Sequence, residues 1–250
     1  MTTLLTTRQL GKTYQVDAAP VPSLIGVDLT VVAGELVVLM GSSGSGKSTL
    51  LYLLSGLERP SEGEIDFDGK RLDRMDETEL SLLRRSGIGF VFQAINLIPH
   101  LTLFENVVLP GYLLEPDRNK VDTRARELLV SMGIGRLADR LPSQVSGGEQ
   151  QRTAIARALI NSPRALFADE PTGALNSAAG SAVLDAFRDI NARGQTIVMA
   201  THEVKSACIG DRVVFLKDGR TQGEYRIRDS KLNPAEREAA LLAWLVEQGW

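Results

Sequence analysis

The chain has 250 residues, and its 28 lysines and arginines nearly balance its 31 aspartates and glutamates, which gives a formal net charge of −3 at pH 7. That length suffices for one large α/β domain or two smaller ones, and the balanced charge provides no positive field that would favour nucleic acid. The single cysteine, Cys208, excludes an intramolecular disulfide framework and fits a reducing compartment.

The sequence contains no candidate membrane segment. Its first residues lack the basic start and apolar stretch of a signal peptide, and its longest apolar run, 239–246, is far shorter than the ~20 residues that span a bilayer. We therefore expect a cytosolic protein, and any role at a membrane must come through a partner.

The first 40 residues favour strands over helices. The runs 4–10 and 24–32 predict two strands, separated by Pro20 and Pro22. Tyr14 lies between these runs. An aromatic residue ahead of a phosphate-binding loop could stack on a purine, although a lone Tyr in a strand is more often ordinary sheet surface, so both interpretations stay open for Tyr14 at this point.

A glycine-rich segment follows the apolar strand-like run 36–40 and opens a helical run at 50–54. Strand, glycine-rich turn and helix N-terminus together make a nucleotide-phosphate loop. Glycines let successive N–H groups curl round an anion, Lys47 supplies a charge for the β- and γ-phosphates, and Ser48 supplies a hydroxyl for Mg²⁺. A flexible Gly/Ser linker would not lie between a buried strand and a Leu-rich helix. The loop consists of Gly41, Ser42, Ser43, Gly44, Ser45, Gly46, Lys47, Ser48 and Thr49.

The middle of the chain begins with a buried strand and then turns helical. Residues 88–92 predict the strand, which ends at Gln93; this side chain could reach a metal or a water, or merely cap a loop. Residues 96–160 are mainly helical and indicate a subdomain inserted in a strand-bearing chain. Their apolar start, 96–104, is either packed or a docking surface for a partner.

A second helix N-terminus follows this region. Ser146 and Glu149 have the spacing of a capping box, so Ser146 is the expected N-cap. Gly147 and Gly148 leave the helix start bare, which would allow it to approach a second anion. A capped helix is common, however, and on its own carries no function.

Two further strands end in polar residues. The run 165–169 ends in Asp169 and Glu170, and burying a carboxylate there is costly unless it pairs with a partner such as the Mg²⁺ held by Ser48. Glu170 would then be free to orient or deprotonate water. The run 196–201 ends at His202, which we expect at the same sheet edge.

The last part of the chain predicts a hairpin and a helix. The hairpin covers 213–220 and turns at Asp218-Gly219. The helix starts at Asn233-Pro234, where Asn233 and Glu236 have the spacing of a capping box. It carries Leu241, Leu242, Leu245 and Val246 on one broad face, for which core packing is the expected role and contact with a neighbour the alternative.

These motifs, in this order, resemble the nucleotide-binding subunit of an ATP-binding cassette (ABC) transporter over about residues 4–225. Residues 41–49 match the Walker A loop, 145–149 the family signature and 165–169 the Walker B strand. Four single positions also match: Tyr14 the adenine-stacking aromatic, Gln93 the Q-loop, Glu170 the catalytic glutamate and His202 the switch histidine. The segments 90–99, 146–152 and 169–175 are most similar to the LolD/MacB/BceA branch.

The resemblance implies an α/β fold: a RecA-like P-loop NTPase core with an antiparallel β subdomain and an inserted α-helical subdomain. It places an ABC-type ATP-binding domain at 1–228, with the helical subdomain at about 94–162, and a C-terminal amphipathic helix at 229–250.

The resemblance also assigns ATP and Mg²⁺ as cofactors. Ser48, Gln93 and Asp169 would hold the metal, and the catalytic residues would be Glu170, His202, Lys47 and Gln93. The nucleotide would bind Tyr14, the loop 41–49, and the signature residues Ser146, Gly147, Gly148 and Glu149.

Two positions depart from the family pattern. The D-loop usually reads Ser-Ala-Leu-Asp, whereas this chain has Gly173-Ala174-Leu175-Asn176, which puts communication between two sites of a dimer in doubt. Glu149 stands where Gln is commoner, and we expect its carboxylate to point away from the triphosphate.

One chain carries one Walker A loop and one signature, so we expect a head-to-tail homodimer with two shared ATP sites. The expected partner is an integral-membrane permease docked near residues 94–110 at the inner face of the membrane. The alternative is a regulatory or scaffold ATPase of the FtsE type. A soluble ABC ATPase on DNA or ribosomes would need a coiled-coil insertion or a second cassette, and an unrelated P-loop kinase would have no use for residues 145–152.

Overall fold

The computed structural model describes residues 2–17, 19–227 and 232–250, and it divides into two compact units. Unit 1 consists of Met1–Leu80 and Gly194–Trp250, and unit 2 consists of Ser81–Arg193. The expected boundary between residues 228 and 229 falls on residues outside those described. The expected limits of the helical subdomain, 94–162, stay a prediction.

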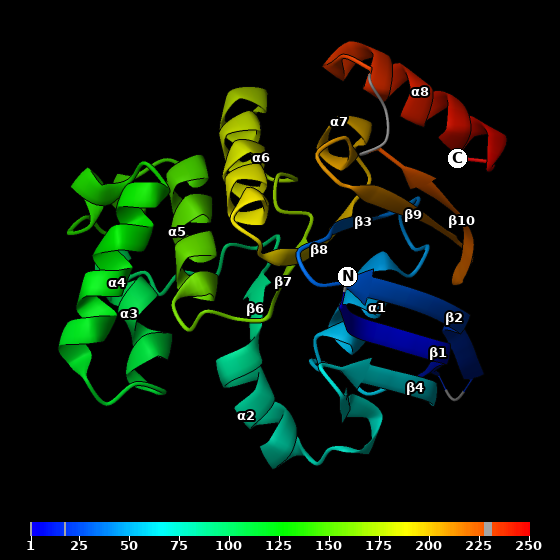
Figure 1. Cartoon of the computed structure of the whole chain (residues 1–250), viewed down its shortest axis with the longest axis horizontal. Coiled ribbons are helices and arrows are strands. Elements are labelled where there is room, and N and C mark those ends of the chain that lie inside the picture. The colour runs from blue at the N-terminus through cyan, green and yellow to red at the C-terminus, as the bar shows by residue number, and fades with distance from the viewer. Residues whose placement is uncertain (1, 18, 228–231) are drawn as a thin grey trace. The chain divides into compact units, whose positions relative to one another are not determined.

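Unit 1 begins with an antiparallel sheet of four strands in the order β2-β1-β4-β5 (Figure 1). Successive side chains along these strands point to opposite faces of the sheet. Leu5 and Phe67 are paired and buried on one face, whereas Thr6 and Asp66 pair on the other. The strands are β1 (Thr3–Val16), β2 (Ala19–Val32), β4 (Glu62–Phe67) and β5 (Lys70–Arg71).

The two prolines that separated the predicted strands lie inside β2. Pro20 pairs with Gln15, and Pro22 pairs with Thr13, so the hairpin is longer at its tip than we expected. The reason is the position of β2 at the sheet edge, where a missing backbone N–H leaves no central ladder bond unmade. The expectation that these prolines interrupt the strands was wrong.

The second group of strands in unit 1 has the order β10-β9-β3-β8. The central strand β3 (Leu36–Met40) is parallel to β8 (Thr196–Thr201) and to β9 (Arg212–Lys217), and all five of its residues are buried. The predicted hairpin is confirmed, because β10 (Arg220–Arg226) pairs antiparallel with β9 after a turn in which Asp218 and Gly219 have positive φ.

Among its described residues, unit 1 holds or begins five helical elements. They are α1 (Lys47–Leu54), the 3₁₀ turn Leu72–Arg74, α2 (Glu77–Gly87), which runs across the boundary at residues 80–81, α7 (Val204–Ala207) and α8 (Pro234–Glu247). In α8 the predicted capping box is confirmed, because Asn233 and Glu236 exchange hydrogen bonds.

The apolar face of α8 is only partly covered. Leu241 and Leu245 are buried, and Trp244 contacts the rings of Phe215 and Tyr225, so α8 packs on β9 and β10. The other two expected core residues, Leu242 and Val246, are 44% and 60% exposed. The single broad face was therefore wrong for these two, because one helix resting on a sheet edge buries only the stripe that points at it.

Unit 2 contains one pair of parallel strands and four helices. The strands are β6 (Ile88–Val91) and β7 (Ala165–Asp169). The helices are α3 (Leu103–Tyr112), α4 (Arg118–Ser131), α5 (Gly147–Leu159) and α6 (Ser177–Ala192), with 3₁₀ turns at Gly135–Leu137 and Pro142–Gln144. Helix α3 contacts both α4 and α5, and α5 contacts α6, which makes these helices one packed layer.

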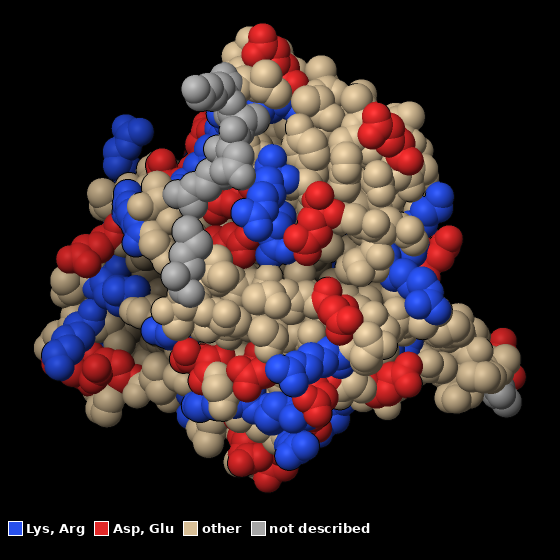
Figure 2. All heavy atoms as spheres, turned by 45° about the vertical axis from the view of Figure 1, so that its right-hand side comes forward, with Lys and Arg blue, Asp and Glu red and all other residues tan. Residues whose placement is uncertain are grey.

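Over the face drawn in Figure 2, acidic and basic side chains are interspersed and do not gather by sign. This distribution agrees with the near balance of charge in the sequence and provides no extended basic surface there.

An ion-pair network centred on the buried Arg212 joins the two strand groups of unit 1. Arg212 on β9 donates to Glu35 at 2.9 Å, to Glu224 at 2.7 Å and to the carbonyl oxygen of Thr30 at 2.6 Å. Arg212 is 8% exposed, so its charge depends on these acceptors.

We predict that Arg212→Ala lowers the free energy of unfolding by about 3 kcal/mol, since it leaves the Glu35 carboxylate half-buried without its cation. The double variant Arg212→Leu with Glu35→Leu should recover much of that loss, because both charges are then removed together. Urea unfolding of the three proteins measures this. Equal destabilisation of the single and double variants would show that packing, and not charge, explains the loss.

Candidate functional site

The phosphate loop lies between β3 and α1 and has the backbone shape that its sequence predicts. Gly44 and Gly46 have φ of 81° and 102°, in the left-handed region. A Cβ on Gly46 would lie 2.8 Å from the carbonyl oxygen of Ser23, and one on Gly41 would lie 2.4 Å from that of Leu216. Both positions therefore require glycine for space, and Gly46 requires it for conformation as well.

Lys47 begins α1 and turns its side chain back into the loop. Its ammonium donates to the carbonyl oxygens of Gly41 at 2.7 Å and Ser42 at 3.1 Å, and the residue is only 7% exposed. The buried Ser45 hydroxyl has no hydrogen-bond partner among the described residues. A buried ammonium, an orphan hydroxyl and a glycine cradle at a helix N-terminus fit a polyphosphate.

His202 lies at the same sheet edge as the phosphate loop. Thr201 pairs with Met40 in the parallel ladder of β8 and β3, so His202 and Gly41 follow directly at the ends of neighbouring strands. His202 is exposed and is followed by a turn in which the Thr201 hydroxyl accepts the N–H of Glu203 at 3.1 Å. Within unit 1, His202 and the phosphate loop therefore lie at the same edge of the strand group.

Tyr14 is the remaining expected site residue of unit 1. It is half-buried near the end of β1, and its hydroxyl donates to Glu58 at 2.5 Å. The side chain of Thr49, the last residue of the loop, also acts on that hydroxyl and lowers the pKa of Tyr14, against the larger raising effects of burial and Glu58. Sequence analysis missed Glu58, because no local pattern links a residue after α1 to a tyrosine 44 positions earlier.

Unit 2 brings Gln93 and Glu170 together. Gln93 is exposed just beyond β6, and its side-chain Nε2 would lie 3.2 Å from a Cβ placed on Gly173. That same Cβ position is 3.4 Å from the carbonyl oxygen of Glu170. Asp169 ends the buried strand β7 and is 6% exposed. Amide and carboxylate oxygens are the donors that Mg²⁺ takes, so Asp169 and Gln93 fit a metal site chemically.

Glu170 has a φ of 42°, which places a non-glycine residue in the left-handed region. Its carbonyl oxygen accepts the N–H of Gly173 at 3.0 Å and so closes the turn that leads into the D-loop. Strained backbone of this kind is concentrated at functional sites, where the surrounding structure holds it in place.

The signature segment begins α5 as predicted. The Ser146 hydroxyl accepts the N–H of Glu149, and the Glu149 carboxylate accepts the N–H and the hydroxyl of Ser146, both at 2.7 Å. These bonds from the Ser146 hydroxyl and N–H lower the pKa of Glu149. Its carboxylate is thus occupied in the capping box, while Ser146 and Gly147 are exposed at the helix start.

The start of α6 lies against the start of α5. Gly148 has no room for a larger residue, since a Cβ there would approach that of Ala179 to 2.9 Å, and one on Gly147 would lie 3.3 Å from Leu175. Asn176 is the N-cap of α6, and its side-chain oxygen accepts the N–H of Ala179 at 2.9 Å. The unusual D-loop residue therefore performs a capping role that Asp performs equally well.

Gln151 and Arg157, which sequence analysis did not single out, connect α5 to the strand end that carries Gln93. Gln151 is 1% exposed and donates to the carbonyl oxygen of Phe92 at 3.4 Å. Arg157 donates to the carbonyl oxygens of Ile95 and Asn96 at 3.1 and 2.6 Å. The segment after Gln93 is thus held to the signature helix by side chains.

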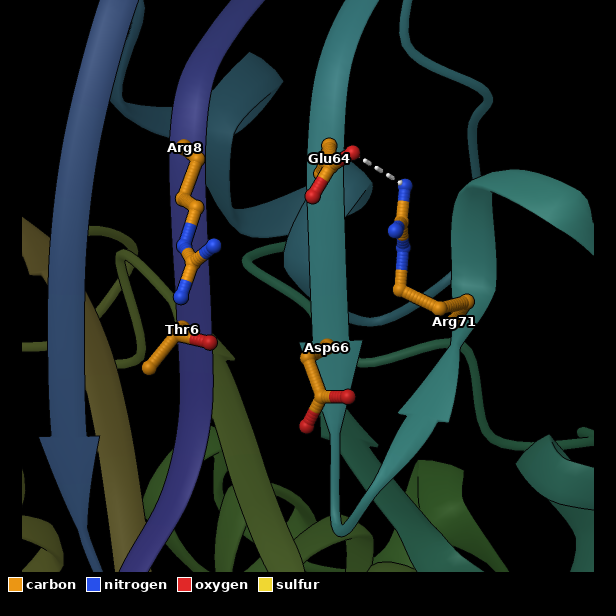
Figure 3. Close-up of a pocket in the computed structure, with 5 residues that line it drawn as sticks. All are labelled: Thr6, Arg8, Glu64, Asp66 and Arg71. Carbon is orange, nitrogen blue, oxygen red and sulfur yellow. Dashed lines mark ion pairs between the residues drawn. The ribbon is translucent and has the colours of Figure 1, made fainter.

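A shallow hollow on the outer face of the antiparallel sheet has a different character (Figure 3). Two arginines and two carboxylates line it with Thr6, and the ion pair of Arg71 with Glu64 at 2.9 Å crosses it. Arg71 also pairs with Asp73 at 2.7 Å. With its charges matched, this hollow offers no surplus of cations to a phosphate, unlike the loop at 41–49. Its lining residues are Thr6, Arg8, Glu64, Asp66 and Arg71.

Comparison with known proteins agrees with this geometry. The family model described as "ABC transporter" matches residues 24–173. The chain is 49% identical over 201 residues to the lipoprotein-releasing system ATP-binding protein LolD of Aquifex aeolicus, covering 80% of this chain and 90% of that protein. It is 42% identical over 223 residues to the macrolide export ATP-binding/permease protein MacB of Chlorobaculum tepidum, covering 89% of this chain but 34% of that protein.

A solved structure is similar over most of the chain. It is the dimeric post-hydrolysis state of the ATP-binding cassette MJ0796, from Methanocaldococcus jannaschii, bound to ADP and Pi. The TM-score is 0.81 at 38% sequence identity, covering 91% of this chain and all of that one. These similarities confirm the expected α/β fold of the RecA-like P-loop type.

The capping role of Asn176 predicts how the D-loop tolerates substitution. Asn176→Asp should leave the free energy of unfolding within about 0.5 kcal/mol of the wild type, whereas Asn176→Ala should lower it by about 1 kcal/mol. Chemical denaturation measures both. A loss for Asp as large as that for Ala would mean that the cap contributes no stability.

Proposed function

This chain belongs to the ABC transporter family and is an ATPase of its LolD/MacB branch, and on that premise we propose that it powers a membrane complex through closure of an ATP-bound homodimer. The observation that carries the proposal is that one chain has two helix N-termini suited to bind an anion. One is the phosphate loop at the start of α1, and the other is the signature at the start of α5.

The two elements call for two copies of the chain. The phosphate loop already provides a helix N-terminus and a buried lysine for the triphosphate bound in its own chain. The exposed start of α5, with Ser146 and Gly147, is then available to the γ-phosphate held by another copy. The dimeric state of the MJ0796 structure supports this arrangement.

Each site residue has a proposed role. Lys47 and the backbone of the loop 41–49 bind the phosphates, and Tyr14 stacks on the adenine. Ser48, Gln93 and Asp169 would hold Mg²⁺, which when bound neutralises charge that develops on the phosphate oxygens. Glu170 would accept the proton of the attacking water, and His202 would contact the γ-phosphate. Residues 146–149 would complete the site of the partner copy.

A membrane partner is the second part of the proposal. Among the described residues no helix is long and apolar enough to cross a bilayer. The MacB relative, of which the chain covers 34%, is named as an ATP-binding and permease protein, which supports a permease as the membrane component that this chain drives. Two exposed apolar side chains within residues 94–110, Ile98 and Leu109, support docking of that partner there, at the inner face of the membrane.

The names of the relatives also support a particular kind of membrane complex. The LolD relative is named for lipoprotein release and the MacB relative for macrolide export, so we propose an export or lipoprotein-release type of complex. Antimicrobial-peptide resistance belongs to the same proposed type.

We predict that Glu170→Gln lowers ATP turnover by about a hundredfold or more, since the amide cannot accept the proton of water. The variant should still bind ATP and elute as a dimer only when ATP is present, because its dimer is not opened by hydrolysis. Phosphate release and size-exclusion chromatography measure the two effects.

The matched control is Glu238→Gln, an exposed acid on α8, which should behave as the wild type. Wild-type turnover by Glu170→Gln would remove Glu170 from the role of base. An ATP-bound monomer of that variant at all concentrations would contradict the shared sites.

A further inference from the structure

The ring of Tyr14 is held at its hydroxyl edge by Glu58, which lies just after α1. The Glu58 carboxylate accepts the hydroxyl proton at 2.5 Å. In the first turn of α1, Thr49 lowers the pKa of the same hydroxyl and shares a 2.9 Å hydrogen bond with Ser23 on β2. The hydroxyl edge of the ring is thereby tied to the chain just beyond the helix that the phosphate loop begins.

Lys12 covers one face of the same ring. Its ammonium lies 5.0 Å from the ring centroid of Tyr14, within range of a cation–π contact. It is fixed there by Glu58 at 2.8 Å and by the carbonyl oxygen of Arg59, also at 2.8 Å. The Lys12 side chain is only 14% exposed. One face of Tyr14 is therefore occupied by a cation, and a flat ligand must use the other.

The charges of this group are well defined at neutral pH. Burial and the hydrogen bond to Glu58 raise the pKa of Tyr14, so its hydroxyl keeps its proton and donates. Burial alone would raise the pKa of Glu58, but the hydrogen bonds from Lys12 and Tyr14 outweigh it and lower that pKa. Glu58 is thus an anion that accepts from both neighbours.

We propose that Lys12 and Glu58 are positioning residues for ATP: they fix the plane of the Tyr14 ring relative to the phosphate loop, so that adenine stacks on the face opposite Lys12. This inference rests on the proposed role of Tyr14. The base and the triphosphate belong to one ligand, so a correctly placed Tyr14 ring lets both bind without strain. A mobile ring would weaken only the contact with the base and would leave the contacts of the phosphates unchanged.

The alternative is that the same bonds only fasten β1 to α1. Two ligands separate these possibilities. Mg·ATP engages both the ring and the loop, whereas inorganic tripolyphosphate with Mg²⁺ engages the loop without a base. If these bonds only fasten β1 to α1, their loss would disturb the loop through α1 and weaken the binding of both ligands equally. If they position the Tyr14 ring, their loss would weaken the binding of ATP and leave the binding of tripolyphosphate unchanged.

The experiment measures the affinity of both ligands, by calorimetry and by competition against a fluorescent ATP analogue. Glu58→Ala should weaken Mg·ATP by about three- to tenfold and change tripolyphosphate by less than about twofold. The KM for ATP should rise by more than kcat falls. Glu58→Gln, which keeps a carbonyl acceptor for the Tyr14 hydroxyl, should restore most of the affinity.

A double-variant cycle ties the effect to the ring. In a Tyr14→Ala background, Glu58→Ala should change the affinity for ATP by less than about twofold, because no ring remains to be positioned. Lys12→Met should act as Glu58→Ala does, while Lys70→Met, on an exposed lysine of β5, is the matched control.

The outcomes are distinct. Equal losses for ATP and tripolyphosphate, or an unchanged effect of Glu58→Ala without the ring, would overturn the positioning role. Wild-type ATP affinity in Glu58→Ala, with a clear loss in Tyr14→Ala, would overturn it as well but leave Tyr14 as the stacking residue. Wild-type affinity in Tyr14→Ala would instead contradict the proposed role of Tyr14 itself.

Discussion

The burial of one ammonium group is the constraint on which the phosphate loop depends. Lys47 is nearly enclosed, and a buried cation is costly unless oxygen atoms surround it. The carbonyl oxygens of Gly41 and Ser42 turn inward to accept its protons, and they can do so only because the glycines allow the chain to curl round it. The charged phosphates of ATP would complete that environment. The fully buried strand β3, between β8 and β9, supplies the fixed base from which the loop begins.

In unit 2, the segments that carry the proposed site residues are held by contacts with the same helix, α5. The start of α5 packs against the start of α6, so the signature segment is in contact with the residues that lead into α6. Gln151 and Arg157 extend the same helix to the backbone that follows β6, where Gln93 lies. The segment that carries Gln93 is thus joined to the signature helix by side-chain hydrogen bonds of 2.6 to 3.4 Å.

Much of this was predictable from local sequence signals. The glycine spacing of the phosphate loop, the capping boxes at Ser146 and Asn233, and the Asp218-Gly219 turn each depend on residues within a few positions of one another, and all were correct. What could not be predicted depends on distant parts of the chain. Whether a strand can contain Pro20 depends on whether that strand lies at the edge of its sheet.

Two further features were beyond the sequence for the same reason. Leu242 and Leu241 are neighbours in sequence with opposite exposure, because exposure is decided by what covers the helix. Glu58 and Tyr14 meet only after α1 and β1 have packed, so no spacing rule could pair them. The water-activating role of Glu170 was inferred from its place after a buried strand, the roles of Gln93 and His202 followed from the family resemblance, and all three remain proposals.

The shared ATP site is the central claim, and cross-linking between copies tests it most directly. Ser42, in the phosphate loop, and Ser146, in the signature, are both exposed, and Cys208 is the only native cysteine to replace. Ser42→Cys protein and Ser146→Cys protein, each with Cys208→Ser and Glu170→Gln, are mixed and oxidised mildly. The account predicts a covalent dimer that forms in the mixture with ATP, and far less without ATP or from either protein alone. A mixture that stays monomeric with ATP, or that cross-links equally well without it, would contradict a site built from two copies.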